Sequence, residues 1–137
     1  MADSIRKIEY YYVVIDDKAG KWSWFLPYLR DNNVNMVAFT AFPVGAGKSQ
    51  LDFFPEDAER LLQAAEAAGV TLTGPKKAFL IQGEDAAGAL LKYHLQLSEA
   101  GVNVHAANGA SGGQGRFGYV LWVKPEDYQA AARVLGV

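Results

Sequence analysis

The feature that most constrains the fold is an internal repeat, found when the chain is compared with itself at a shift of 68 residues. At that shift DDKAGKWSWFLPYLRDNNVNMVAF (16–39) aligns with EDAAGALLKYHLQLSEAGVNVHAA (84–107). FFPEDAERLLQAA resembles VKPEDYQAAARVL at a shift of 70, and we assign the two extra residues to the glycine-rich stretches, because hairpin loops tolerate insertion. The 137 residues are therefore predicted to form two similar units, residues 1–74 and 75–137.

The first unit begins with a pattern of strand, helix, strand and strand. Aromatic and β-branched residues in IEYYYVVI (8–15) predict the first strand. One helical face follows, formed by Trp22, Phe25, Leu26 and Leu29. Pro27 lies early in this helix, so its regular part is expected to be short or bent. The alternating segments VNMVAFTAF (34–42) and SQLDFF (49–54) predict the next two strands.

Between those two strands, the stretch GAGKS resembles part of a phosphate-binding loop. That loop needs a glycine where Phe42 stands, and it needs a helix where SQLDFF follows. We therefore predict a β-hairpin connection, with a counterpart in GASGGQGRFG (109–118).

The rest of the first unit predicts a helix and a strand. Pro55 is expected to open the helix, with Asp57 among the acidic residues that complement its N-terminus, and Gly69 is expected to end it. VTLT (70–73) predicts a fourth strand, and GPKK (74–77) predicts a linker.

The second unit repeats the pattern from Ala78 but has no obvious fourth strand before Val137. An unpaired sheet edge invites unwanted association. We therefore predict that this edge pairs with another copy of the chain or with the N-terminal segment.

These features resemble the ACT domain, a βαββαβ ferredoxin-like regulatory module. A first strand that ends in Asp, an Ala-Gly pair that opens a helix, and EAGVNV before the second strand carry the resemblance, which covers nearly the whole chain as two tandem copies. LSEAGVNVHAA (97–107) is the most specific part, and LRDNNVNMVAF (29–39) is a weaker copy. The family usually has proline where Ala19 and Ala87 stand, and glycine where Asn33 stands, although asparagine tolerates left-handed geometry. The resemblance implies an α+β fold of two ferredoxin-like units, each an antiparallel sheet with two helices on one face.

The resemblance also implies a function. ACT domains usually sense small metabolites, most often amino acids, where two such domains meet and beside the turn between the first strand and the first helix. At such a turn a glycine lets the backbone approach a ligand, and the N–H groups at the helix start favour a carboxylate. The predicted ligand-binding residues are Asp17, Ala19, Gly20, Lys21, Trp22 and Asn35 in the first unit, and Asp85, Ala87, Gly88, Ala89, Leu90 and Asn103 in the second.

Each of these residues also has a structural interpretation. Asp17 and Asp85 could accept from an ammonium group, or they could only cap the helix start. The two glycines could only permit the turn, and the two asparagines could only fix local backbone. Lys21 could be a solvated surface charge.

Composition limits the remaining function classes. The net charge of −2 argues against a nucleic-acid surface, and the lack of cysteine excludes thiolate metal sites and disulfides. No signal peptide precedes the first strand, and no apolar run approaches the ~20 residues of a membrane span. We expect a soluble, cytoplasmic protein without a cofactor, a metal or a membrane partner.

Two alternatives stay open beside the ACT resemblance. QGRFGYVLW (114–122) approximates the aromatic signature of RNA-recognition motifs, although its first two positions are inverted and its surroundings are not basic. A small enzyme with its active site in an oligomer cleft is the other alternative, although His94 and His105 have no metal spacing.

We predict a non-catalytic, allosteric regulator that forms a homo-oligomer such as a homodimer. We place Trp24, which lies off the core-facing stripe, at an interface.

Overall fold

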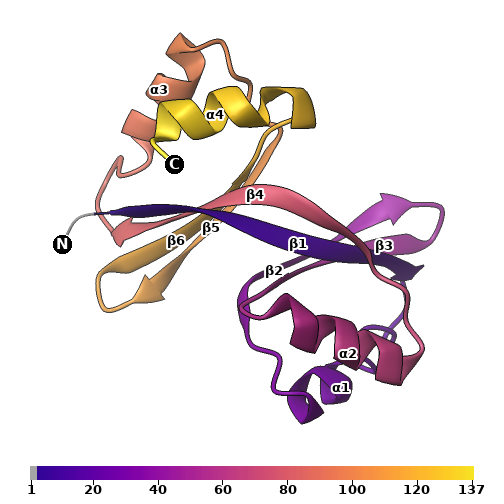
Figure 1. Cartoon of the computed structure of the whole chain (residues 1–137). Coiled ribbons are helices and arrows are strands. Elements are labelled where there is room, and N and C mark those ends of the chain that lie inside the picture. The colour runs from indigo at the N-terminus through magenta and orange to yellow at the C-terminus, as the bar shows by residue number, and fades with distance from the viewer. Residues whose placement is uncertain (1–2) are drawn as a thin grey trace. The chain divides into compact units, whose positions relative to one another are not determined.

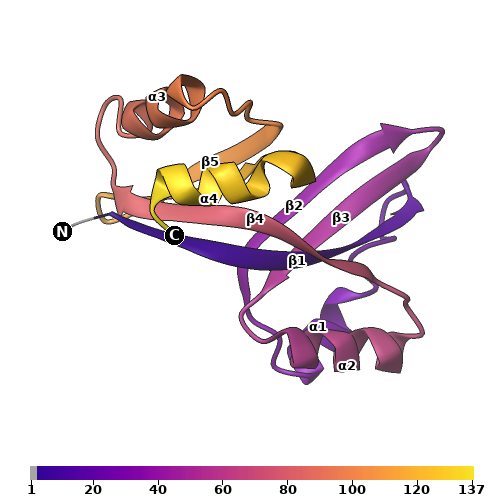
Figure 2. The ribbon, with the colours of Figure 1, turned by 45° about the horizontal axis from the view of Figure 1, so that its top comes forward.

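The computed structural model describes residues 3–137, which form an α+β structure with two compact units (Figure 1 and Figure 2). Residues 9–76 form one of them, called the 9–76 unit below. Residues 77–137 form the other together with residues 3–8, and this is called the 77–137 unit. The strands are β1 (Ser4–Asp16), β2 (Met36–Gly45), β3 (Lys48–Pro55), β4 (Thr73–Glu84), β5 (Ala106–Gly113) and β6 (Arg116–Trp122). They follow the order β2-β3-β1-β4-β6-β5, and both β1 and β4 contribute residues to each unit.

The 9–76 unit packs two helices against its strands. Its elements are most of β1 (Ser4–Asp16), α1 (Leu26–Asp31), β2 (Met36–Gly45), β3 (Lys48–Pro55), α2 (Ala58–Ala68) and the beginning of β4 (Thr73–Glu84). Within it β3 pairs antiparallel with both β1 and β2. Its core joins strand and helix residues: Tyr11, Phe25, Leu29, Leu51, Phe53, Leu61, Ala64 and Ala65.

The 77–137 unit has the same kind of core. Its elements are the rest of β4, α3 (Leu91–Glu99), β5 (Ala106–Gly113), β6 (Arg116–Trp122), a short 3-10 turn η1 (Pro125–Asp127), α4 (Tyr128–Leu135) and the first residues of β1. In it β6 pairs antiparallel with both β4 and β5. Its core contains Phe79, Ile81, Tyr93, Leu97, Val102, Phe117, Leu121, Val123, Tyr128, Ala131, Ala132 and Leu135.

The open edge predicted for the second half of the chain is occupied. β1 is the neighbour of β4, and residues 3–8 belong to the 77–137 unit. The Tyr93 hydroxyl donates to the Asp3 carboxylate, and Lys92 Nζ lies 3.1 Å from the same carboxylate, so α3 holds the beginning of β1 in place. The prediction that the N-terminal segment covers this edge is confirmed.

The first helix is shorter than predicted. α1 begins at Leu26 with Pro27 in its first turn, and irregular turns replace the helix predicted from Trp22 onward. Phe25 and Leu29 are buried as predicted, whereas Trp22 and Leu26 are 42% and 40% exposed. The proline explains the late start, because its missing N–H and fixed φ suit only the first turn of a helix.

The start of the second helix also differs from the prediction. Pro55 is the last residue of β3, and the helix begins at Ala58. Asp57 is its N-cap, since the Asp57 carboxylate accepts from the Glu59 N–H at 3.0 Å. Gly69 ends the helix in the left-handed conformation, as predicted.

The predicted linker is part of a strand. GPKK (74–77) lies inside β4, which continues from Thr73 to Glu84, whereas most of VTLT (70–73) precedes that strand. The prediction of a linker is wrong because the turn-forming residues of this segment do not reveal its pairing with a distant strand. Gly74 lies directly against Tyr10 of β1.

Both glycine-rich stretches are hairpin connections, as predicted. The first joins β2 to β3 through Ala46 and Gly47, and the second joins β5 to β6 through Gln114 and Gly115. The shift between the hairpins differs from the prediction. Leu51 pairs with Val13, and Tyr119 pairs with Ile81, so Tyr119 corresponds to Leu51 at the same shift of 68.

The sequence comparison at a shift of 70 matched Tyr119 to Ser49 instead, and this match is wrong. The two extra residues lie after β6 rather than in the glycine-rich stretch. The error of two residues moves no residue of this strand to the other face, because side chains alternate with a period of two. Leu121 and Val123 lie in the core, and Tyr119 packs against it.

A buried carboxylate in the 9–76 unit gives a prediction about stability. Asp52 is 3% exposed and accepts hydrogen bonds from Thr40 Oγ1 at 3.1 Å and Gln50 Nε2 at 2.9 Å. Burial raises the pKa of Asp52 above its ordinary value, although both hydrogen bonds act in the opposite direction. A carboxyl whose folded-state pKa is raised stabilises the fold when protonated, and this contribution is lost as pH rises through the folded-state pKa.

We therefore expect Asp52→Asn to be more stable than the wild type at pH 7 to 8 and similar to it near pH 4. Asparagine can keep both bonds, because its carbonyl accepts from Gln50 and its amide donates to the Thr40 hydroxyl. Urea unfolding of both proteins across this pH range measures the difference between their free energies of unfolding. The contributions of the carboxyl groups that both proteins share cancel in this difference. A difference in unfolding free energy that does not grow with pH would contradict the prediction.

Candidate functional site

Each of the two predicted turns begins with an equivalent backbone hydrogen bond. The Asp17 N–H donates to the Gly47 carbonyl, and the Asp85 N–H donates to the Gly115 carbonyl, both at 2.8 Å. Each turn therefore starts where a strand end is bonded to the tip of a hairpin. The donor and the acceptor of the second bond lie 68 residues after those of the first.

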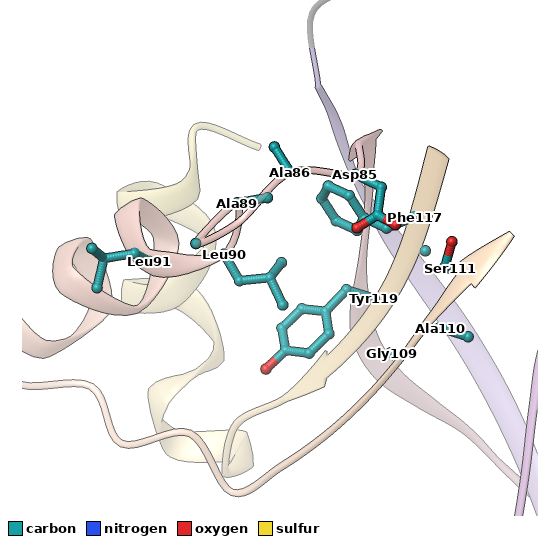
Figure 3. Close-up of a pocket in the computed structure, with 12 residues that line it drawn as sticks. Asp85, Ala86, Ala89, Leu90, Leu91, Gly109, Ala110, Ser111, Phe117 and Tyr119 are labelled. Atoms are coloured by element: carbon teal, nitrogen blue, oxygen red, sulfur yellow. The ribbon is translucent and has the colours of Figure 1, made fainter. Parts of the chain in front are cut away.

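A pocket of about 510 Å³ lies beside the second turn (Figure 3). It is lined by Asp85, Ala86, Gly88, Ala89, Leu90 and Leu91 from the turn, Gly109, Ala110 and Ser111 from β5, and Phe117, Gly118 and Tyr119 from β6. Figure 3 shows Leu90 pointing towards the Tyr119 ring and Leu91 pointing away from it. The pocket lies entirely within the 77–137 unit.

A smaller pocket of about 290 Å³ lies beside the first turn, within the 9–76 unit. It is lined by Ile15, Asp16, Asp17, Lys18, Ala19, Gly20 and Trp22, by Ala41, Phe42 and Pro43 of β2, and by Ser49 and Leu51 of β3. Nine of these positions fall on lining residues of the larger pocket when moved by 68 residues. The two pockets therefore have equivalent walls.

A third pocket of about 670 Å³ lies on another side of the first turn. It is lined by Val14, Ile15, Asp16, Ala19, Gly20, Lys21, Trp24 and Lys48. Lys48 Nζ forms an ion pair with the Asp16 carboxylate, and this bond lowers the pKa of Asp16. One of its two lysines is therefore already engaged, which reduces the charge available for an anionic ligand.

The structure brings most of the predicted site residues to these pockets. Asp17, Ala19, Gly20 and Trp22 line the 290 Å³ pocket, Lys21 lines the 670 Å³ pocket, and Asp85, Gly88, Ala89 and Leu90 line the 510 Å³ pocket. Ala87, Asn35 and Asn103 are exposed and line none of the three. The Asn35 carbonyl accepts from the Glu56 N–H at 2.8 Å, so that residue has a backbone contact in the 9–76 unit.

Neither aspartate caps a helix. The N-cap positions of α1 and α3 are Phe25 and Leu90, and neither has a side-chain cap bond. Within residues 3–137 the carboxylates of Asp17 and Asp85 accept no hydrogen bond. Capping therefore does not account for these two aspartates, and both carboxylates are exposed to solvent.

Backbone donors are also available at the second turn. Ala89 and Leu91 donate to carbonyls within the turn, whereas the N–H groups of Ala87 and Gly88 make no backbone hydrogen bond in the described part of the chain. A Cβ built on Gly88 would meet no atom within 4 Å, so the backbone there faces open space. Such N–H groups ahead of a helix suit a carboxylate.

Sequence reasoning missed the wall that lies opposite the turns. Gly109, Phe117 and Tyr119 come from β5 and β6, and Tyr119 forms a 2.8 Å hydrogen bond with His94 Nε2 of α3. Burial raises the pKa of the Tyr119 hydroxyl. The aromatic pattern of QGRFGYVLW was the available signal, and it pointed to RNA instead. Phe117 lies in the hydrophobic core, so it is not presented for stacking on a base.

No group of three or more His, Cys, Asp or Glu side chains within residues 3–137 could hold a metal ion. In the same residues, no helix has the length and apolar character needed to cross a membrane.

Comparisons with known proteins identify the fold. No family model matches the sequence, and no curated protein matches it. A solved protein from Bacteroides thetaiotaomicron is similar with a TM-score of 0.81 and 17% identity, over 96% of this chain and 88% of that one. The ligand-free regulatory subunit of aspartate kinase from Thermus thermophilus is similar with a TM-score of 0.67 and 17% identity, over 98% and 94%.

The regulatory subunit of aspartate kinase from Thermus flavus is also similar, with a TM-score of 0.64 and 15% identity over 99% of this chain and 95% of that one. At these identities the likeness concerns the fold alone. The chain therefore has the α+β, ACT-like fold of aspartate kinase regulatory subunits, and this part of the sequence prediction is confirmed.

Proposed function

We propose that this chain is a non-catalytic regulatory protein, built from two tandem ACT-like units, that binds a small metabolite of the amino-acid class. The observation that carries the proposal is the pair of pockets with equivalent walls, each beside a turn predicted from the sequence to bind ligand.

The chemistry of the 510 Å³ pocket suits an amino acid. The Gly88 N–H can donate to an α-carboxylate, and the Asp85 carboxylate can accept from an α-ammonium group. The apolar wall is left for the side chain of the ligand. Opposite charges at opposite ends of the turn would orient the ligand.

Regulation requires that the ligand favours one arrangement of the protein over another. The pockets are open to solvent, so we propose that a second copy of the chain closes them in a homodimer, and that ligand binding changes the strength of this association. Trp24, which is 53% exposed, is the side chain proposed to lie at the interface. The site between two ACT-like units that the resemblance implies stays a prediction.

The test is amino-acid binding by the intact chain and by Asp85→Asn. We expect at least one amino acid to bind in calorimetric titration, and the substitution to weaken binding about 10- to 100-fold, because a hydrogen bond to a charged group contributes roughly 1.5–3 kcal/mol. Asn cannot offer a charge to the ammonium group but has nearly the same shape.

The matched control is Glu99→Gln, which removes an exposed carboxylate at the end of α3 in the same unit, away from the pocket. It should bind as the wild type does. Failure of every amino acid to bind the wild-type protein, or an equal loss in both variants, would overturn the proposed function.

A further inference from the structure

The two equivalent pockets differ in size for a reason visible in their lining. Trp22, Phe42 and Pro43 stand in the smaller pocket where Leu90, Ala110 and Ser111 stand in the larger one. Trp22 also stacks on Phe39, with ring centroids 5.4 Å apart. Small-molecule sites usually measure roughly 300–1,000 Å³. The 510 Å³ pocket lies well inside that range, and the 290 Å³ pocket lies at its lower end.

The larger pocket also has a simple charge pattern. Asp85 is the one charged side chain among its lining residues, and the N–H groups of the turn supply the donors. The rest of the wall is apolar or small, and Leu90 and the Tyr119 ring are among its apolar members. A second charge on a ligand would find no partner in this lining, and leaving it unpaired would be costly.

Tyr119 is held in a fixed position at both ends. Gly109 lies opposite it in the β5–β6 ladder, and a Cβ on Gly109 would stand 2.7 Å from Tyr119 Cδ1. The ring therefore packs directly on the glycine backbone, while its hydroxyl bonds His94. In the 9–76 unit the equivalent pair is Ala41 opposite Leu51. The larger wall residue, Tyr119, thus lies opposite a glycine, whereas the smaller one, Leu51, lies opposite an alanine.

We infer that the 77–137 pocket is the principal ligand site, that it selects an amino acid with a compact, uncharged, apolar side chain, and that Tyr119 determines this selectivity by forming the surface on which that side chain packs. The inference rests on the proposed function and deepens it.

The first experiment ranks ligands for the full-length protein by calorimetric titration with glycine, alanine, valine, leucine, phenylalanine, aspartate and lysine. We expect alanine, valine or leucine to bind at least tenfold more tightly than aspartate or lysine. Binding led by aspartate or lysine, and lost in Asp85→Asn, would overturn the inference while the proposed function stands. Absence of binding by the whole panel would overturn both.

The second experiment tests Tyr119 with three variants. Tyr119→Phe keeps the ring, so the rank order of ligands should stay the same and affinity should change less than about threefold. Tyr119→Leu should weaken the preferred ligand at least tenfold and move preference towards bulkier side chains. Gly109→Ala should push the ring into the pocket and also weaken binding at least tenfold.

The double variant Gly109→Ala/Tyr119→Leu reproduces the pair found in the 9–76 unit, so it is expected to fold even if Gly109→Ala alone does not. It should be more stable than Gly109→Ala and should keep the altered preference of Tyr119→Leu. An unchanged rank order in both leucine variants would overturn the role of Tyr119. A purely structural role would lower stability without changing the rank order.

Discussion

Gly74→Ala is expected to lower the free energy of unfolding by about 2–4 kcal/mol, which is large for one methyl group. A Cβ at this position would lie 2.8 Å from the Tyr10 carbonyl oxygen and 2.9 Å from Tyr11 Cδ2. The backbone φ of +146° is a second cause, because residues with a Cβ rarely adopt it. The contact with the Tyr10 carbonyl cannot be relieved by rotating a side chain, because that oxygen belongs to the backbone of β1.

Chemical denaturation of Gly74→Ala measures this loss, with Gly118→Ala as the matched control. Gly118 is also a strand glycine, but a Cβ there would meet nothing within 4 Å, and its φ is outside the left-handed range. The control should change stability by less than about 0.5 kcal/mol. Equal effects in the two variants would mean that the contact between β1 and β4 at Gly74 does not limit stability.

The same glycine illustrates what the sequence could not foresee. Local patterns predicted the hairpins, the helix capped by Gly69, and the buried positions Phe25 and Leu29, because turn chemistry and helical spacing act over a few residues. GPKK was predicted as a linker for the same reason. Its incorporation into β4 depends on β1, which is distant in the sequence, and no local pattern encodes that pairing.

The residues of the candidate site likewise include some that local patterns predict and some that they do not. The turn residues Asp85 and Gly88 could be predicted because they are contiguous with a strand end and a helix start. Tyr119 could not, because its place in the pocket depends on strand register and on the glycine opposite it. Trp22 has the helical spacing of a core-facing residue, and periodicity alone predicted it on the same face as Phe25 and Leu29. Pro27 delays the start of the helix, however, and leaves Trp22 exposed.

Leu97→Ala is expected to lower the free energy of unfolding by about 2–5 kcal/mol. Leu97 of α3 is fully buried, and it belongs to the core that also contains Phe79, Tyr93 and Leu121. Removing its side chain takes apolar atoms out of that core and leaves a cavity that strands on one side and helices on the other cannot fill without moving.

The matched control is Leu95→Ala, in the same helix and with the same change of atoms. Leu95 is 50% exposed, so alanine should cost little, and it also has the higher helix propensity. Urea unfolding followed by far-ultraviolet circular dichroism compares the two variants. The difference between them isolates core packing from helix propensity, because propensity changes equally in both. If Leu95→Ala proved as destabilising as Leu97→Ala, the face of α3 turned towards the sheet would be different from the one described.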